Sequence, residues 1–160
     1  MMGKWHLIYG GVVGVLLMAL GTMLYLFVLA GKTTTVAEDK REAIVLEPAE
    51  RALLLAEMRG FLGAVQAISA AVVRDDPAAI AKAARAQGMA AAHAVPPTLA
   101  AKLPIGFKQL GHGVHQDFDR IAIDAEAMGD SKLALSRLSE TLNRCIACHG
   151  VYQLAVAPAR

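Results

Sequence analysis

The chain has 160 residues, of which 56% are hydrophobic and only 19% are charged, and its formal net charge is +2. This length allows one domain with an appendage, and the apolar content is high for a protein that lies wholly in water. The lysines and arginines are scattered along the chain, so nothing in the composition indicates nucleic-acid binding. Part of the apolar content must therefore lie outside an ordinary core.

The N-terminal stretch from Leu7 to Ala30 carries no charged residue. A helix of this length, at about 1.5 Å per residue, can cross a bilayer core of about 30 Å. A cleaved signal peptide is the alternative, but its apolar core usually has about 7–15 residues and ends at a small-residue cleavage site. The sequence "LAGKTTT" offers no clear A-x-A site. We therefore predict an uncleaved transmembrane anchor over residues 1–31 and a juxtamembrane linker over residues 32–47.

The remaining residues, 48–160, show helical periodicity and almost no strand signals. Four segments carry apolar residues at spacings of three and four, and Pro, Gly and Asp separate them. They run from about 48 to 74, from 77 to about 93, from about 104 to 128, and from 131, with Ser131 as the expected N-cap, to about 153. These segments predict an all-α fold, an antiparallel up-down-up-down four-helix bundle preceded by one N-terminal transmembrane helix.

The last predicted helix ends in "RCIACHGVYQL", which holds both cysteines of the chain. Two thiols three residues apart can bond the vinyl groups of a haem, and the adjacent His149 can then reach the iron. A thioredoxin-type dithiol normally begins a helix after a strand, whereas Cys145 and Cys148 come near a helix end. A zinc site needs a second pair of ligands, for which His112 and His115 are candidates. A disulfide across C-x-x-C would be strained and would leave the histidine unexplained. We favour one covalent haem c, and we expect Cys145 and His149 on the buried face of the helix.

A C-x-x-C-H motif at the end of the last of four helices resembles the class II c-type cytochromes, that is, the cytochrome c prime family and its low-spin relatives. The resemblance covers about residues 48–154. It implies thioether bonds from Cys145 and Cys148, and His149 as the proximal iron ligand. It also implies that the haem domain lies in the periplasm and that the N-terminus lies on the cytoplasmic side of the bacterial cytoplasmic (inner) membrane. Members of this family often form dimers through the first two helices.

Function in this family depends on the distal side of the haem, where high-spin members place an apolar residue and bind gases. Low-spin members place a methionine from the first helix there and carry electrons. Met58 lies on the apolar stripe of the first predicted helix, level with the motif in an antiparallel bundle, so we expect it as the distal ligand; a core methionine is the alternative. His115 is a rival ligand or a haem-pocket residue. Further candidates are propionate partners, Arg51, Arg59 and Arg144, and apolar neighbours of Met58, namely Leu54, Leu55 and Leu62.

These expectations describe a membrane-anchored periplasmic cytochrome that carries single electrons between redox protein partners and is not itself an enzyme. Two alternatives stay open. One is a protein that binds nitric oxide or carbon monoxide through an open distal side. The other is a fixed haem subunit of a larger membrane oxidoreductase complex, in which the small-residue face of "GGVVG" packs against another helix.

Overall fold

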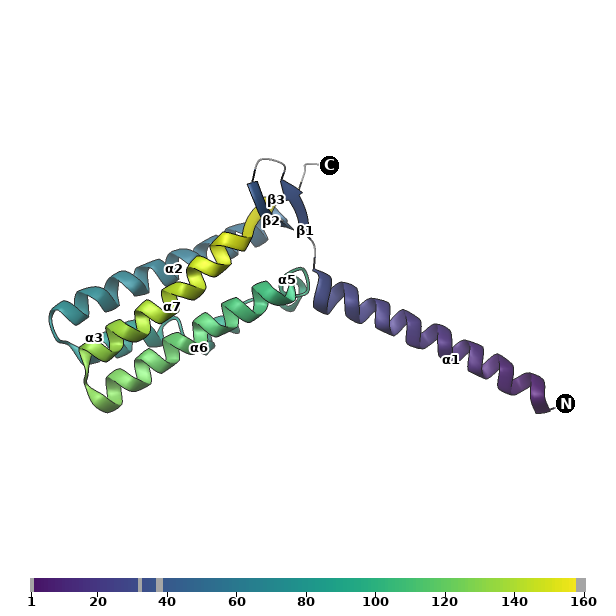
Figure 1. The fold of residues 1–160 in the computed structure, drawn as a ribbon, viewed down its shortest axis with the longest axis horizontal. Coiled ribbons are helices and arrows are strands. Elements are labelled where there is room, and N and C mark those ends of the chain that lie inside the picture. The colour runs from purple at the N-terminus through teal and green to yellow at the C-terminus, as the bar shows by residue number, and fades with distance from the viewer. Residues whose placement is uncertain (1, 32, 37–38, 158–160) are drawn as a thin grey trace.

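A computed structural model describes residues 2–31, 33–36 and 39–157. Residues 1, 32, 37–38 and 158–160, which belong to the predicted anchor, linker and bundle, lie outside the described part. Helix α1 (Met2–Leu24) continues as a π-helix, η1 (Tyr25–Ala30), and projects away from the rest of the chain (Figure 1). The segment Tyr9–Val28 is long and apolar enough to cross a bilayer, and none of it is buried in the protein. An exposed apolar N-terminal helix is thus confirmed, and it fits a membrane anchor or a signal sequence.

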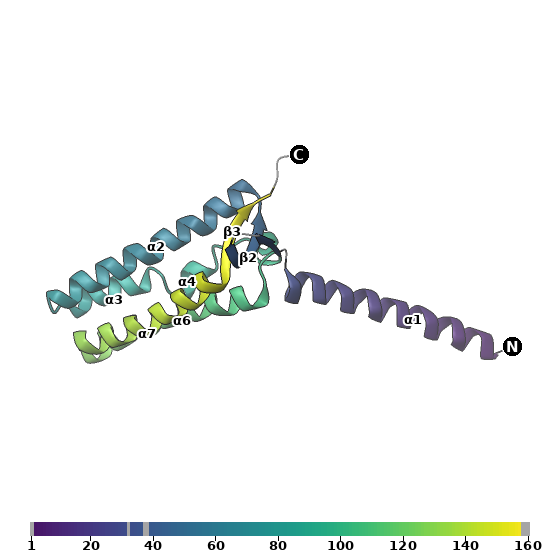
Figure 2. The same cartoon turned by 45° about the horizontal axis from the view of Figure 1, so that its top comes forward.

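The body of the protein is formed by packed helices. Its main helices are α2 (Pro48–Val73), α3 (Pro77–Arg85), α6 (Ile105–Met128) and α7 (Ser131–Val151). Helices α3 and α7 both pack against α2 and against α6, and the long helices α6 and α7 run in opposite directions (Figures 1 and 2). The mostly helical fold and the bounds of the first, third and fourth predicted helices are confirmed. Helix α2 is also long and apolar enough to pass for a membrane span, but it contributes to the core.

The second predicted helix is wrong beyond Arg85. Two single-turn helices follow α3, namely α4 (Met89–Ala92) and α5 (Pro97–Ala100). Gly88 is the N-cap of α4, and the Asp119 carboxylate of α6 accepts a hydrogen bond from the Met89 backbone N–H at 2.9 Å. A Cβ atom on Gly88 would lie 1.9 Å from Asp119 Oδ1. The long helix is therefore interrupted by a glycine and by a carboxylate that reaches it from another part of the sequence.

A small sheet, absent from the prediction, closes the end of the helical body where the cysteines lie. Its strands are β1 (Thr33–Val36), β2 (Asp39–Leu46) and β3 (Tyr152–Val156), in the order β1-β2-β3. β1 pairs with β2 antiparallel and β2 with β3 parallel, with Glu42 opposite Tyr152. Ile44 and Leu46 of β2 are at most 1% exposed. The all-α class and the linker over 32–47 are corrected accordingly, because β2 belongs to the core.

The core consists of two clusters. The larger one lies among α2, α3, α6 and α7 and contains Phe61, Ile68, Ile80, Val114, Phe118, Ile121 and Leu138, with Met58 packed against it. The smaller one joins the sheet to the helices and contains Ile44, Leu46, Leu54, Leu99, Leu103 and Phe107. Cys148, Tyr152 and Leu154 pack against the smaller cluster. The motif thus lies where the sheet meets the helices.

Helix α7 buries a different face from the one that we predicted. Its N-cap is Asp130 rather than Ser131, since the Asp130 carboxylate accepts hydrogen bonds from the backbone of Lys132 and Leu133. The buried residues of the helix are Ser131, Ala134, Leu138 and Thr141. Continued at the same spacing, this face contains the half-buried Cys145, Cys148 and Tyr152. At several turns the face that we predicted lies one position beyond the buried face, so its residues Leu135, Leu142 and His149 are exposed. The end of α6 at Gly129 is confirmed, and its φ of 62° is the left-handed conformation of a helix C-cap.

Candidate functional site

A groove of about 310 Å³ lies between α2, α7 and the sheet. Its lining comes from β2, α2, the start of α6, the end of α7 and β3: Arg41, Arg51, Leu55, Met58, Phe107, Cys148, His149, Tyr152, Gln153 and Leu154. The volume is at the lower end of the range of about 300–1,000 Å³ typical of ligand and cofactor sites. Apolar side chains predominate on the α2 side, and two guanidinium groups lie at the groove.

Met58 and His149 line this same groove. Met58 is half-buried on α2, about three turns from the start of the helix, and His149 is exposed near the end of α7. The thioether and the imidazole are the two side-chain types that hold the iron in low-spin c-type cytochromes. The structure therefore places the two expected ligands on one cavity, although they are 91 positions apart in the chain (149 − 58).

The two cysteines are free thiols, and both are half-buried. Burial raises the pKa of Cys145, with a smaller contribution from the nearby Asp117 carboxylate. Burial also raises the pKa of Cys148, and the neighbouring Cys145 adds to the effect. A redox-active dithiol needs the opposite, a lowered thiol pKa, and usually obtains it at a helix N-terminus. The geometry disfavours a thioredoxin-type function, because here the pair is near the C-terminal end of α7.

Two arginines of the groove hold the end of α7 and the strand that follows it. Arg41 Nη1 donates to the backbone carbonyl of His149 at 3.2 Å, and Arg51 Nε donates to the carbonyl of Leu154 at 3.1 Å. Arg51 was predicted as a propionate partner, and it does lie at the groove. Arg41 was missed, because we assigned its segment to the linker. The short apolar run "AIVL", rich in β-branched residues, is compatible with a buried strand, but by periodicity alone it cannot be told from a helix end.

Phe107 and Tyr152 form the end of the groove nearest the sheet. Their rings meet edge to face, with centroids 5.6 Å apart and an interplanar angle of 83°. A Cβ atom on Gly106 would lie 2.6 Å from the Tyr152 hydroxyl oxygen. Burial raises the pKa of Tyr152, and the charges of Glu42 and Cys148 add to this effect. The ring contact between Phe107 and Tyr152 fixes the C-terminal end of α7 against the start of α6. Sequence reasoning found neither aromatic residue as part of the site.

His115 lies away from the groove. It is 4% exposed, its ring centroid is 4.9 Å from that of Phe61, and both ring nitrogens are engaged within the protein. Nδ1 lies 2.8 Å from the carbonyl oxygen of Gln87, and Nε2 lies 3.1 Å from Glu57 Oε1. Burial lowers the pKa of His115, but the hydrogen bonds to the Glu57 carboxylate and to Gln87 outweigh it, so the net shift is upward. A nitrogen that ligates iron must be unprotonated, whereas these two acceptors favour a ring protonated on both nitrogens.

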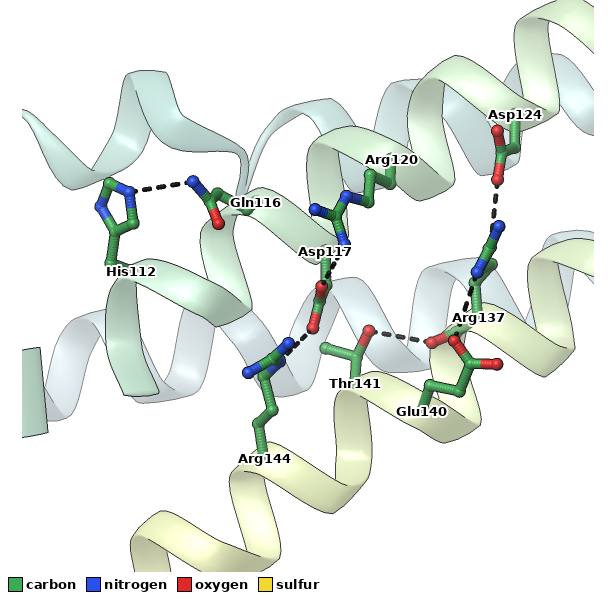
Figure 3. A network of polar contacts seen from close by, with 9 residues as sticks. All are labelled: His112, Gln116, Asp117, Arg120, Asp124, Arg137, Glu140, Thr141 and Arg144. Atoms are coloured by element: carbon green, nitrogen blue, oxygen red, sulfur yellow. Dashed lines mark hydrogen bonds and ion pairs between the residues drawn. The ribbon is translucent and has the colours of Figure 1, made fainter. Parts of the chain in front are cut away.

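The remaining predicted residues are not part of the groove lining, except for Leu55. Leu62 is 70% exposed and Arg59 is exposed, both on α2. Arg144 Nε donates to Asp117 Oδ2 at 2.6 Å, within a polar network between α6 and α7 (Figure 3). The same network pairs Arg120 with Asp117, and Arg137 with both Asp124 and Glu140. Arg144 thus already has a carboxylate partner on a different face of the protein.

The zinc interpretation finds no support in the geometry. In the part of the chain that the structure describes, no group of three or more His, Cys, Asp and Glu side chains is arranged to hold a metal ion. His112 hydrogen-bonds to Gln116, and His115 hydrogen-bonds to Glu57. Both histidines are therefore engaged with residues other than the two cysteines.

Comparison of the chain with protein-family models, with curated proteins and with solved structures gave no match.

Proposed function

We propose that the chain is a c-type cytochrome of the helical-bundle class, related in architecture to the class II cytochromes. The observation that carries this proposal is the shared groove of Met58, Cys148 and His149, which brings the last two residues of the C-x-x-C-H motif to the same cavity as a thioether from α2; Cys145 itself is not among the lining residues. More particularly, we propose a membrane-anchored electron carrier with a single covalent haem. The packing of α2, α3, α6 and α7 supports it, because such bundles commonly hold a cofactor between facing helices.

The residues present fit a haem group. Cys145 and Cys148 would supply the thioether bonds, His149 the proximal ligand and Met58 the distal ligand. Arg41 and Arg51 at the groove would pair with propionates, since a guanidinium binds a carboxylate through two hydrogen bonds. The chemistry that haem supplies when bound is a reversible one-electron change of the iron.

The protein's own residues favour electron transfer over gas binding. Met58 lies on the groove, where its thioether would be available as an iron ligand, and a methionine ligand would raise the reduction potential of a bound haem. Leu55 and Phe107 add apolar surface to the same groove. The gas-binding alternative needs an open distal side, and therefore needs Met58 to be absent from the iron.

The exposed apolar helix supports a membrane anchor on the same chain. Its end is tied to the helical body, since Lys108 Nζ of α6 donates to the carbonyl oxygen of Val28 at 3.1 Å. A tether raises the effective concentration of the carrier near membrane-bound partners. We place the haem domain in the periplasm, where c-type haem is attached, and propose redox proteins as partners, with a fixed place in a larger membrane complex as the alternative.

The test is an optical spectrum of the full chain produced with a haem-attachment system. We expect a pyridine haemochrome of one haem bound through two thioethers, and a low-spin ferric spectrum with a weak methionine-to-iron band in the far red. Met58→Ala should abolish that band and make the ferrous protein bind carbon monoxide. Met128→Ala is the matched control, because Met128 is 58% exposed and lies outside the groove lining.

Two results would contradict the proposal in different ways. A protein that matures without covalent haem would overturn the cytochrome assignment itself. A high-spin wild type that binds carbon monoxide would overturn the sealed electron carrier in favour of a gas-binding protein. N-terminal sequencing of the mature protein tests the anchor, and a start after about Gly31 would show a cleaved signal peptide.

A further inference from the structure

A second cavity, of about 260 Å³, lies on the other side of Phe107 from the groove. Phe107 lines both cavities, and so its ring is a shared wall. The other walls are mostly apolar and come from α2, α4, α5, α6 and the short segments that follow α4 and α5, with Leu54, Val95 and Leu103 among them. The proposed cytochrome function makes no use of this space.

The inner end of the second cavity is formed by a hydrogen-bonded pair, Glu57 and His115. The side chains of this pair are only 20% and 5% exposed, respectively. Both His115 nitrogens already have partners, Gln87 and Glu57, so the Glu57 carboxylate is the member of the pair that can accept a further hydrogen bond from a ligand hydroxyl. Such a pair at the bottom of an apolar cavity is typical of a binding site, where a few polar groups fix the orientation of a mostly apolar ligand.

The outer end of the cavity lies beside the end of the N-terminal apolar segment. Lys108 lines the cavity, and its Nζ donates to the carbonyl oxygen of Val28. Gly31 follows three residues later with a φ of 66°, and a Cβ atom there would lie 2.7 Å from the backbone nitrogen of Pro104. The chain is thus packed closely against α6 at this point. If Tyr9–Val28 spans the bilayer, the mouth of the cavity is at the membrane surface.

We propose that this cavity binds the ring of a hydroquinone that is dissolved in the membrane. The flat ring matches the apolar walls, one hydroxyl would donate to the Glu57 carboxylate, the oxygen at the other end of the ring would accept from the Lys108 ammonium, and the apolar tail would extend toward the bilayer. A fatty acid fits less well, because its carboxylate would meet only one cation at the rim and the Glu57 carboxylate inside. The inference rests on the anchor of the proposed function, but not on the haem.

Gly111 offers a way to block the cavity without disturbing the fold. It lines the cavity, and a Cβ atom built on it meets no atom within 4 Å. Gly111→Leu should therefore fill the space, while the change from glycine favours the helix. Gly63→Leu is the matched control, since Gly63 is also in a helix, also meets no atom within 4 Å, and is exposed on α2 away from the cavity lining.

The experiment uses the full chain in phospholipid nanodiscs and a photoreactive azidohydroquinone with a ten-carbon tail as the probe. Labelled residues are mapped by mass spectrometry, and the unlabelled hydroquinone with the same tail, or decanoic acid, serves as competitor. We expect labelling of the segments around Val95–Leu103 and Phe107–His115. Gly111→Leu should reduce it at least about tenfold, Glu57→Gln about threefold or more, and Gly63→Leu should leave it unchanged.

Three outcomes would overturn the inference. The first is labelling confined to Tyr9–Val28, and the second is equal labelling of Gly111→Leu and the wild type. The third is displacement by decanoic acid that is as effective as displacement by the hydroquinone, because this result would indicate a site for lipid tails. The readout is independent of the haem. A chain that carries no haem but is labelled as expected would refute only the proposed function, and a haem-loaded chain without specific labelling would refute only the hydroquinone site.

Discussion

The buried Glu57–His115 pair makes the stability of the protein depend on pH in a direction that the structure determines. His115 faces two acceptors, the Gln87 carbonyl and the Glu57 carboxylate, so its protonated form is the one that both hydrogen bonds stabilise. Its pKa is raised in the folded protein. The stabilisation is therefore fully present below the unfolded-state pKa of about 6.5, and it is lost as the pH rises through the higher folded-state pKa.

Glu57→Gln tests this directly, because it keeps the shape and one acceptor oxygen but removes the charge. A hydrogen bond between charged groups contributes about 1.5–3 kcal/mol and a neutral one about 0.5–1.5 kcal/mol, so the variant should lose about 1–1.5 kcal/mol near pH 5.5. At pH values above the folded-state pKa His115 is neutral, and in the tautomer that keeps its proton on Nδ1, toward Gln87, Nε2 is an acceptor that faces the carboxylate. The glutamine amide can donate to that nitrogen, so the loss should vanish or become a small gain.

The assay is urea unfolding of the full chain in detergent micelles, followed by far-ultraviolet circular dichroism between about pH 5.5 and about pH 9. Glu126→Gln is the control, since it breaks an ion pair with Arg85 in which both side chains are about half exposed, and it should cost less than about 1 kcal/mol. An equal loss of stability for Glu57→Gln at every pH, or a loss that grows as the pH rises, would refute the reasoning.

Three further predictions concern the packing around the site. Ile44→Ala should lower the free energy of unfolding by about 2–5 kcal/mol in the same urea assay, because this strand residue is fully buried. Gly88→Ala should lower the free energy of unfolding by about 1–3 kcal/mol, because its Cβ would displace the Asp119 carboxylate from the Met89 N–H. In an Asp119→Ala background the same substitution should lower it by less, because there is no carboxylate to displace. Gly111→Ala should raise the thermal midpoint, through a gain of about 0.5–1 kcal/mol, and a decrease would show that space is lacking there.

The helices could be predicted well because their signals are local. The Pro and Gly breaks and the three-four spacing of apolar residues gave the bounds of α2, α6 and α7 to within about two residues. The prediction failed where a distant residue decides the local structure. Asp119 ends the second helix early by capping Met89, and nothing near Gly88 in the sequence shows that a carboxylate from α6 will arrive there.

The small sheet was missed for the same reason. Each of its strands is short, and a run such as "AIVL" or "YQLAV" has no periodicity that distinguishes a strand from a helix end. β2 and β3 become strands by pairing with each other across more than a hundred residues. Arg41, Tyr152 and Leu154 reach the groove only through this pairing, which is why sequence reasoning did not include them in the site.

By itself, the sequence determined the C-x-x-C-H spacing of Cys145, Cys148 and His149, the apolar N-terminal helix and the helical character of the body. These follow from the chemistry of neighbouring residues and from local periodicity. Only the tertiary structure decided which distant side chains meet the motif. It placed Met58 on the groove, and it turned His115 away to a pair with Glu57. The physical reason is that the packing of α2 against α7 and of α6 against both fixes the facing side chains, and no local signal encodes these contacts.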